Sequence, residues 1–253
     1  MQEISDKLIV ALDVDTLEEA KHFVDILCPT VKLFKIGSQL FTAYGPEAVK
    51  MVAEKGGKVF LDLKFYDIPQ TVYGSSSSAS AICVGPSVMS TGIEQRVEKT
   101  IQPAVFMITV HIQGGKKMLE EAMKGATSKA RELKIERPRI VGVTVLTSDR
   151  QEEDTTNAVL ERAKVAQEAG LDGIVCSVHE AAAVRKAYGK DFIIVTPGIR
   201  PKGAKTDDQK RVATAQEAIE AGADYIVVGR PILRAQNPLL ATEEIRRELC
   251  PKT

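Results

Sequence analysis

The chain has 253 residues, of which 44% are apolar and 27% charged. Its 34 lysines and arginines are balanced by 34 acidic residues, so the basic excess typical of a general nucleic-acid binder is absent. No apolar run approaches the ~18–20 residues of a membrane span, and the acidic start lacks the features of a signal peptide. We therefore expect a cytoplasmic protein that binds neither nucleic acid nor membrane and keeps its four cysteines reduced.

Short β-branched runs alternate with stretches of helical period along the chain. The runs expected to form strands cover residues 7–14, 33–38, 58–65, 106–112, 139–148, 173–178, 192–199 and 225–232. Several are continuously apolar, which is typical of a parallel sheet covered on its outer face. Segments 158–170 and 213–222 place apolar residues at i, i+3 and i+4, with a glycine where a helix would end. This alternation predicts an α/β fold, a single (β/α)8 TIM barrel over residues 1–253. A doubly wound open sheet is less favoured because no GxGxxG follows the first strand.

The longest connection between predicted strands runs from Tyr66 to Val105. It contains four consecutive serines, Ser75–Ser78, and a helix-like stretch at 92–101. Serine and glycine at this density penalise a regular helix and favour loop. We therefore expect an enlarged, partly irregular connection after the third strand, with an insertion within 73–104. The segment has too little apolar material for a second domain.

The strongest local pattern is DLKFYDIPQT at residues 62–71, which begins inside the third predicted strand. Residues i and i+2 of a strand share a face, so Asp62 and Lys64 are expected to point the same way. Charged side chains inside a barrel are costly unless they are paired. Lys35 of the preceding strand can supply a second cation, and Asp67 a second anion just past the strand end. We interpret this Lys–Asp–Lys–Asp array as functional, with a purely structural ion pair as the alternative.

Two glycine–arginine motifs predict an anion site. TPGIR at 196–200 ends the seventh predicted strand, and VVGRPI at 227–232 ends the eighth. The loops after these two strands are the usual phosphate site of a TIM barrel, where backbone N–H groups and arginine forks hold the oxyanion. Plain turn glycines are the alternative. Neither metal-ligand spacing nor a GxSxG nucleophile elbow is present, so we expect charge-driven catalysis without a metal.

Seven motifs in order are similar to those of one known family. They are IVALDV (9–14), FKIG (34–37), DLKFYDIPQT (62–71), VTVLTS (143–148), TPGIR (196–200), DQKRVAT (208–214) and VVGRPI (227–232). On these motifs the chain resembles orotidine 5′-phosphate decarboxylase over nearly its whole length, except about 73–104. The resemblance implies a phosphate-binding (β/α)8 barrel that forms a homodimer. It also implies conversion of orotidine 5′-monophosphate to UMP and CO₂ in pyrimidine synthesis, without a cofactor.

The resemblance also implies a role for individual residues. The implied catalytic set is Lys35, Asp62, Lys64 and Asp67, with Lys64 as the proton donor. The implied substrate-binding set is Asp13, Lys35, Thr71, Thr147, Arg200, Gln209, Gly229 and Arg230. In this assignment Asp13 and Lys35 bind the ribose, and Thr147 lies against the pyrimidine. Gln209 bridges phosphate and base, while Asp67 and Thr71 reach across the dimer interface into the partner's pocket.

Two other functions remain open. A Mg²⁺-dependent sugar-phosphate decarboxylase or aldolase of the same superfamily shares the DxKxxD motif and the phosphate loops. Gln209 and the LTS at 146–148 favour the nucleotide substrate. A non-catalytic nucleotide-binding barrel is the other alternative, because the 73–104 segment begins close to Thr71 and could displace Asp67. Tyr66 stands where the family often has His, and Gln70 where Asn is common.

Overall fold

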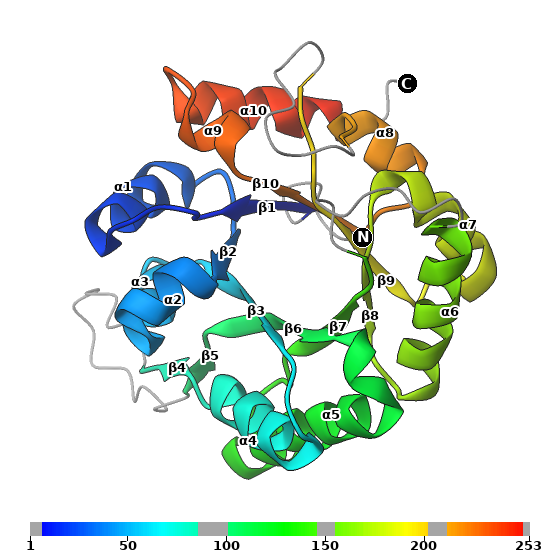
Figure 1. The fold of residues 1–253 in the computed structure, drawn as a ribbon. Helices are drawn as coiled ribbons and strands as arrows, with labels where there is room; N and C mark the ends of the chain where they lie inside the picture. Colours follow the sequence, from blue (N-terminus) through cyan, green and yellow to red (C-terminus); the bar gives the residue numbers. More distant parts are fainter. Residues whose placement is uncertain (1–6, 86–100, 146–154, 202–211, 250–253) are drawn as a thin grey trace.

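The computed structural model describes residues 7–85, 101–145, 155–201 and 212–249. Within them, parallel strands close into a barrel in the order β1-β10-β9-β8-β7-β6-β3-β2 (Figure 1). The barrel strands are β1 (Leu8–Ala11), β2 (Leu33–Gly37), β3 (Lys58–Phe65), β6 (Val105–His111), β7 (Arg139–Val143), β8 (Gly173–Val175), β9 (Ile193–Thr196) and β10 (Tyr225–Val228). The predicted TIM barrel is confirmed, although several strands end earlier than their apolar runs suggest.

Helices surround the barrel on its outside (Figure 1). They are α1 (Leu17–Leu27), α2 (Ser38–Tyr44), α3 (Pro46–Glu54), α4 (Pro69–Ser80), α5 (Gly115–Leu133), α6 (Thr155–Glu168), α7 (Val178–Tyr188), α8 (Ala215–Glu220), α9 (Arg230–Leu233) and α10 (Pro238–Glu248), with a 3-10 turn η2 (Ile112–Gly114). Helix α1 starts at a capping box in which Thr16 and Glu19 satisfy each other's backbone N–H groups. None of the helices in the described ranges is both long and apolar enough to cross a membrane.

Strand alternation divides the core into two layers. The inner layer fills the barrel with Ile9, Ala11, Leu33, Phe60, Met107, Val141, Val195, Tyr225 and Val227. The outer layer packs the other strand faces, for example Leu8 and Val10, against the surrounding helices. Both strand faces are therefore apolar through the middle of the barrel. Charged inward residues lie nearer its ends, such as Arg139 at the start of β7, whose guanidinium lies over the Phe106 ring of the inner layer.

The expectation that Ser75–Ser78 would favour loop is wrong, because helix α4 runs through all four serines. Ser75 donates its hydroxyl to the carbonyl of Thr71, one helical turn earlier, so it does not compete with the helical hydrogen bonds. Helix α4 also lies close to α5. A Cβ on Gly125 of α5 would come within 2.2 Å of the Tyr73 carbonyl oxygen. Packing against α5 thus overrides the low helix propensity of the serines.

The remainder of the long connection returns to the amino-terminal end of the barrel. A short antiparallel ribbon pairs β4 (Cys83–Val84) with β5 (Gln102–Pro103). The carbonyl of Ala104 then accepts from the N–H of Val59, near the start of β3. The connection is therefore enlarged, as expected, but its extra part begins after a complete helix. The helix predicted at 92–101 lies almost entirely outside the described residues, and an insertion within 73–104 stays a prediction.

The cysteines of the described ranges are Cys28, Cys83 and Cys176, and none of the three is part of a disulfide. Burial raises the pKa of the Cys28 and Cys83 thiols, which disfavours the reactive thiolate.

Candidate active site

Side chains at the carboxyl-terminal ends of the barrel strands line a cavity of about 350 Å³. The predicted site residues in its wall are Asp13, Lys35, Asp62, Lys64, Arg200, Gly229 and Arg230. This is the end of a TIM barrel at which active sites are built. The structure therefore brings together residues that are separated by more than 200 positions in the chain.

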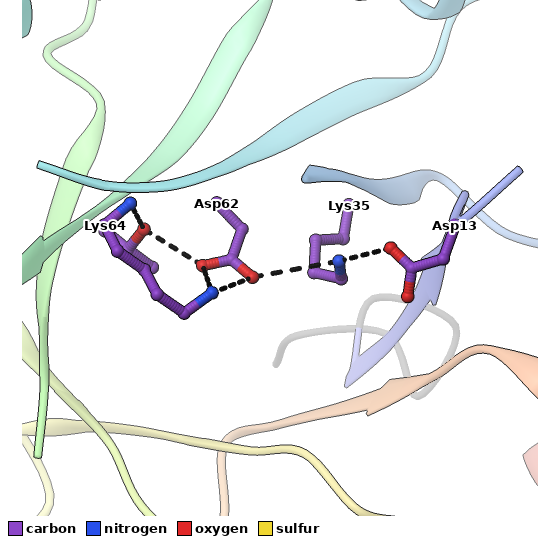
Figure 2. Close-up of polar contacts among 5 residues, drawn as sticks. Asp13, Lys35, Asp62 and Lys64 are labelled. Carbon is purple, nitrogen blue, oxygen red and sulfur yellow. Dashed lines mark hydrogen bonds and ion pairs between the residues drawn. The ribbon is translucent and has the colours of Figure 1, made fainter. Parts of the chain in front are cut away.

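Ion pairs join four of these side chains into a continuous row (Figure 2). The ammonium of Lys64 donates to both oxygens of Asp62 at 2.9 Å. The ammonium of Lys35 lies 3.7 Å from the other side of the Asp62 carboxylate and donates to Asp13 at 2.8 Å. The Lys35 and Asp62 side chains are only 11% and 14% exposed, so water screens their attraction weakly. The row has alternating charge, Asp13–Lys35–Asp62–Lys64, and the side chains hold one another in place.

Parallel pairing of three adjacent strands explains how the row forms. Ala11 pairs with Lys35, and Lys35 pairs with Phe60, which places Asp13 and Asp62 one inward step beyond these partners. Gly37 follows Lys35 on the same face. A Cβ there would lie 3.2 Å from the Lys35 ammonium, so the glycine leaves room for the lysine to turn toward Asp13.

Lys64 reaches the cavity through an irregularity in β3 and not through plain alternation. Leu61 pairs with Ile108 of β6 and Phe65 with Val110, so β3 has two more residues than β6 over this stretch. Lys64 takes a left-handed conformation with φ of 49°, which costs a non-glycine residue about 1–3 kcal/mol. The prediction that Asp62 and Lys64 face the same way is confirmed, but the geometry is that of a bulge.

Thr109 of β6 is a site residue that the sequence analysis missed. It is fully buried, its hydroxyl donates to Asp62 Oδ1 at 3.0 Å, and it accepts from the backbone N–H of Lys64 at 2.8 Å. One signal was present: a threonine at an inward position two residues after Met107 of an otherwise apolar strand. A buried hydroxyl needs a polar partner, and the nearest strand carries Asp62.

The predicted phosphate loops form another wall of the same cavity, which Pro197 and Gly198 also line. Gly198 has φ of 80°, a conformation that favours glycine. The segment is tied back by a bridge between Ile199 and Ala213, and Arg200 is only 7% exposed. At Gly229 a Cβ would lie in van der Waals contact with that of Ala11, at 3.4 Å, so the backbone of this loop lies directly against β1. These loops present arginines and bare backbone, as an oxyanion requires.

Two predicted residues of the described ranges do not line the cavity. Asp67 and Thr71 are exposed around the start of α4, and the Asp67 carboxylate accepts from the N–H of Ile68 at 2.6 Å. In a single chain Asp67 therefore does not join the row of charges. Thr147 and Gln209 lie outside the described residues.

A larger cavity of about 680 Å³ lies at the opposite end of the barrel. Its wall includes Asp172 and Asp224, which Arg137 and Arg185 engage. Asp172 also accepts from the N–H of Ile140 at the start of β7. These carboxylates hold the starts of the strands in place. At this end of a TIM barrel such residues stabilise the fold, and active sites lie at the other end. We therefore assign the site to the smaller cavity.

Across residues 7–85, 101–145, 155–201 and 212–249, no three His, Cys, Asp or Glu side chains group closely enough to hold a metal ion. The carboxylates of the candidate site, Asp13 and Asp62, are instead bound by lysine ammonium groups.

Comparison with known proteins agrees with this geometry. The profile of the orotidine 5′-phosphate decarboxylase / HUMPS family matches residues 6–245. The orotidine 5′-phosphate decarboxylase of Moorella thermoacetica is 43% identical, over 96% of this chain and 92% of its own. That of Coxiella burnetii is 40% identical, over 98% of this chain and 99% of its own. The solved structure of the Lactobacillus acidophilus orotidine 5′-phosphate decarboxylase superposes with a TM-score of 0.77 at 32% identity, covering 96% of this chain and 99% of the other. The chain belongs to the orotidine 5′-phosphate decarboxylase / HUMPS family.

Proposed function

We propose that this chain decarboxylates orotidine 5′-monophosphate to UMP and CO₂ in pyrimidine biosynthesis, without a cofactor. The names of its relatives support the reaction. The residue assignment is supported by one observation above all. The row Asp13–Lys35–Asp62–Lys64 lines the same cavity as Arg200 and Arg230.

In this proposal the substrate spans the cavity from phosphate to base. Arg200, Arg230 and the backbone at Gly229 hold the phosphate. Asp13 and Lys35 bind the ribose hydroxyls, and the base extends toward Lys64. Thr147 against the pyrimidine and Gln209 between phosphate and base complete the assignment by family resemblance. The phosphate grip supplies binding energy far from the reacting carbon, which can hold the base against the charged row.

The proposed chemical step breaks one bond and forms one. The bond between C6 and its carboxylate breaks, CO₂ leaves, and the electron pair stays on C6. Lys64 Nζ then gives a proton to C6, which yields UMP and a neutral amine that regains its proton from water. No ring position delocalises the C6 carbanion well, so a fixed positive charge beside it is the main stabilising factor.

Asp62 and Lys35 have supporting parts in the proposed step. Asp62 holds the Lys64 ammonium through both oxygens and lies near the departing carboxylate. Lys35 keeps Asp62 in place from the other side. Because the charges are already held before substrate arrives, little reorganisation is needed during the reaction.

A homodimer would bring Asp67 and Thr71 into the partner's cavity. Both residues are exposed in the single chain, and Asp67 stands between two large exposed apolar side chains, Tyr66 at 61% and Ile68 at 67%. Exposed apolar groups of this size favour a contact surface. The enlarged part of the 73–104 segment begins only after the end of α4. It therefore does not interrupt the start of that helix, where Thr71 lies.

The proposal is tested by following the loss of orotate absorbance when purified protein is mixed with orotidine 5′-monophosphate in the presence of a metal chelator. We expect the rate of turnover to be the same with and without chelator. Activity on sugar phosphates that requires Mg²⁺ would favour the superfamily alternative. Tight UMP binding without turnover would favour the non-catalytic barrel.

A further inference from the structure

Thr109 of β6 contacts both members of the Asp62–Lys64 ion pair. Its hydroxyl donates to Asp62 Oδ1 at 3.0 Å and accepts from the Lys64 backbone N–H at 2.8 Å. The side chain is fully buried and is not part of the cavity wall. Thr109 therefore cannot touch a substrate in the cavity, and any effect on the reaction must pass through Asp62 or Lys64.

The direction of these hydrogen bonds is fixed by chemistry. A backbone N–H can only donate, and a carboxylate can only accept, so the Thr109 hydroxyl proton must point at Asp62. The result is a one-way chain from Lys64 N–H through Thr109 to Asp62 Oδ1. This chain ties the orientation of the Asp62 carboxylate to the backbone from which the Lys64 side chain departs.

Thr109 also occupies one of the two places where β3 and β6 fall out of register. It lies between Ile108, which pairs with Leu61, and Val110, which pairs with Phe65. The backbone N–H of Lys64 bonds to the threonine side chain in the bulge, and Lys64 itself has a left-handed φ of 49°. The hydroxyl thus supports the unusual backbone that turns the Lys64 ammonium toward Asp62.

We propose that Thr109 is a positioning residue for the decarboxylation, because its hydroxyl sets the angle at which Asp62 holds the Lys64 ammonium against C6. The inference rests on the proposed function, in which Lys64 donates the proton. Loss of the hydroxyl would free one edge of the Asp62 carboxylate and loosen the Lys64 backbone. The ammonium would then sample positions away from the carbon, while the phosphate and ribose contacts on other strands would be unaffected.

The test compares Thr109→Val, which removes the hydroxyl at nearly constant shape, with Thr109→Ser, which keeps it. We expect Thr109→Val to lower kcat for orotidine 5′-monophosphate by about 100-fold, the size of effect that a misplacement of ~1 Å can have. Its Kd for UMP should stay at the wild-type value. Thr109→Ser should retain most of the wild-type kcat.

A control separates positioning from general damage to the fold. Thr242 is also fully buried, and its hydroxyl donates to the Pro238 carbonyl within α10, away from the cavity. Thr242→Val should lower the melting temperature without lowering kcat. The inference is wrong if Thr109→Val turns over like wild type, if Thr109→Ser is as impaired as Thr109→Val, or if kcat falls only in step with UMP binding and melting temperature.

A second readout does not need turnover. Acetic anhydride acetylates lysine side chains, and mass spectrometry can follow Lys64 with exposed Lys50 as internal standard. We expect Lys64 to be acetylated faster in Thr109→Val than in wild type, because a released amine is more reactive than one held by Asp62. An unchanged labelling ratio would overturn the inference. Wild-type protein that labels as expected but fails to decarboxylate the substrate would instead contradict the proposed function.

Discussion

Lys64 combines three features that single it out among the lysines of the described ranges. It has a left-handed backbone, it makes two hydrogen bonds to one carboxylate, and it lies in the wall of the cavity. Strained non-glycine residues persist only where the surroundings hold them, and they cluster at functional sites. The strain at Lys64 is therefore consistent with its proposed part as the proton donor.

Replacement of this residue gives the sharpest prediction at the residue scale. Lys64→Ala should lower kcat by at least roughly 10³-fold, because it removes both the proton donor and the charge beside C6. Orotate absorbance measures the loss, and calorimetry with UMP should show that binding persists. Lys50→Ala on the exposed face of α3 is the matched control and should leave kcat unchanged. Near-normal turnover of Lys64→Ala would remove the proposed mechanism.

Arg230 should affect a different kinetic quantity. If it binds the phosphate, Arg230→Ala loses a charge-assisted hydrogen bond, and kcat/KM for the nucleotide should fall by roughly 10–100-fold. The same change should have little effect on kcat/KM for orotidine, which lacks the phosphate. Equal losses of kcat/KM for the nucleotide and the nucleoside would show that Arg230 does not bind the phosphate.

Helices α4 and α5 approach each other closely enough for backbone to touch backbone. The Tyr73 carbonyl of α4 lies where a side chain at position 125 of α5 would begin. Such an approach is open only to glycine, and α4 carries Thr71 in its first turn. The position of α4 on the barrel therefore depends on residue 125 of α5 being glycine, without a Cβ.

Two glycine substitutions test this packing. Gly125→Ala should lower the free energy of unfolding by about 1–3 kcal/mol, because backbone must move to admit the Cβ. Gly74→Ala, within α4 itself, has nothing within 4 Å of the new Cβ and should raise the free energy of unfolding by about 0.5–1 kcal/mol. Urea denaturation measures both. The same sign for the two variants would contradict the structure of this helix pair.

Over the whole molecule, charged residues at the two ends of the barrel have different roles. At the amino-terminal end, Arg137–Asp172 and Arg185–Asp224 pairs also bind strand backbone and hold the barrel together. At the carboxyl-terminal end, the row from Asp13 to Lys64 borders an open cavity. A TIM barrel separates stability from function in this way.

Shared sites in a homodimer give a prediction at the same scale. If Asp67 serves the partner's cavity, Lys64→Ala and Asp67→Ala should each be inactive alone. Co-refolding the two variants in equal amounts should restore about one quarter of the wild-type sites, since half of the dimers are mixed and each mixed dimer has one intact site. A mixture no more active than its separate components would show that Asp67 does not act across an interface.

Local patterns in the chain were sufficient to predict the eight barrel strands, because each strand is a short apolar run whose burial does not depend on its neighbours in detail. The motifs at the strand ends also contained several of the residues that line the cavity, from Asp13 and Lys35 to Arg230, but Asp67 and Thr71 lie outside it in the single chain. The roles of Thr147 and Gln209 stay predictions.

Only the tertiary structure decided how these parts meet. Propensity favoured loop at Ser75–Ser78, yet that segment is helical within α4, which approaches Gly125 of α5 closely at Tyr73. Helix stability in proteins comes mainly from such tertiary packing. Strand alternation placed Asp62 and Lys64 on one face, but the bulge in β3 and the Thr109 hydroxyl that orient them depend on pairing with β6, more than 40 residues further along the chain. Sequence periodicity reports the face on which a side chain lies. The partner that it meets there depends on strand register, which is a property of the closed barrel.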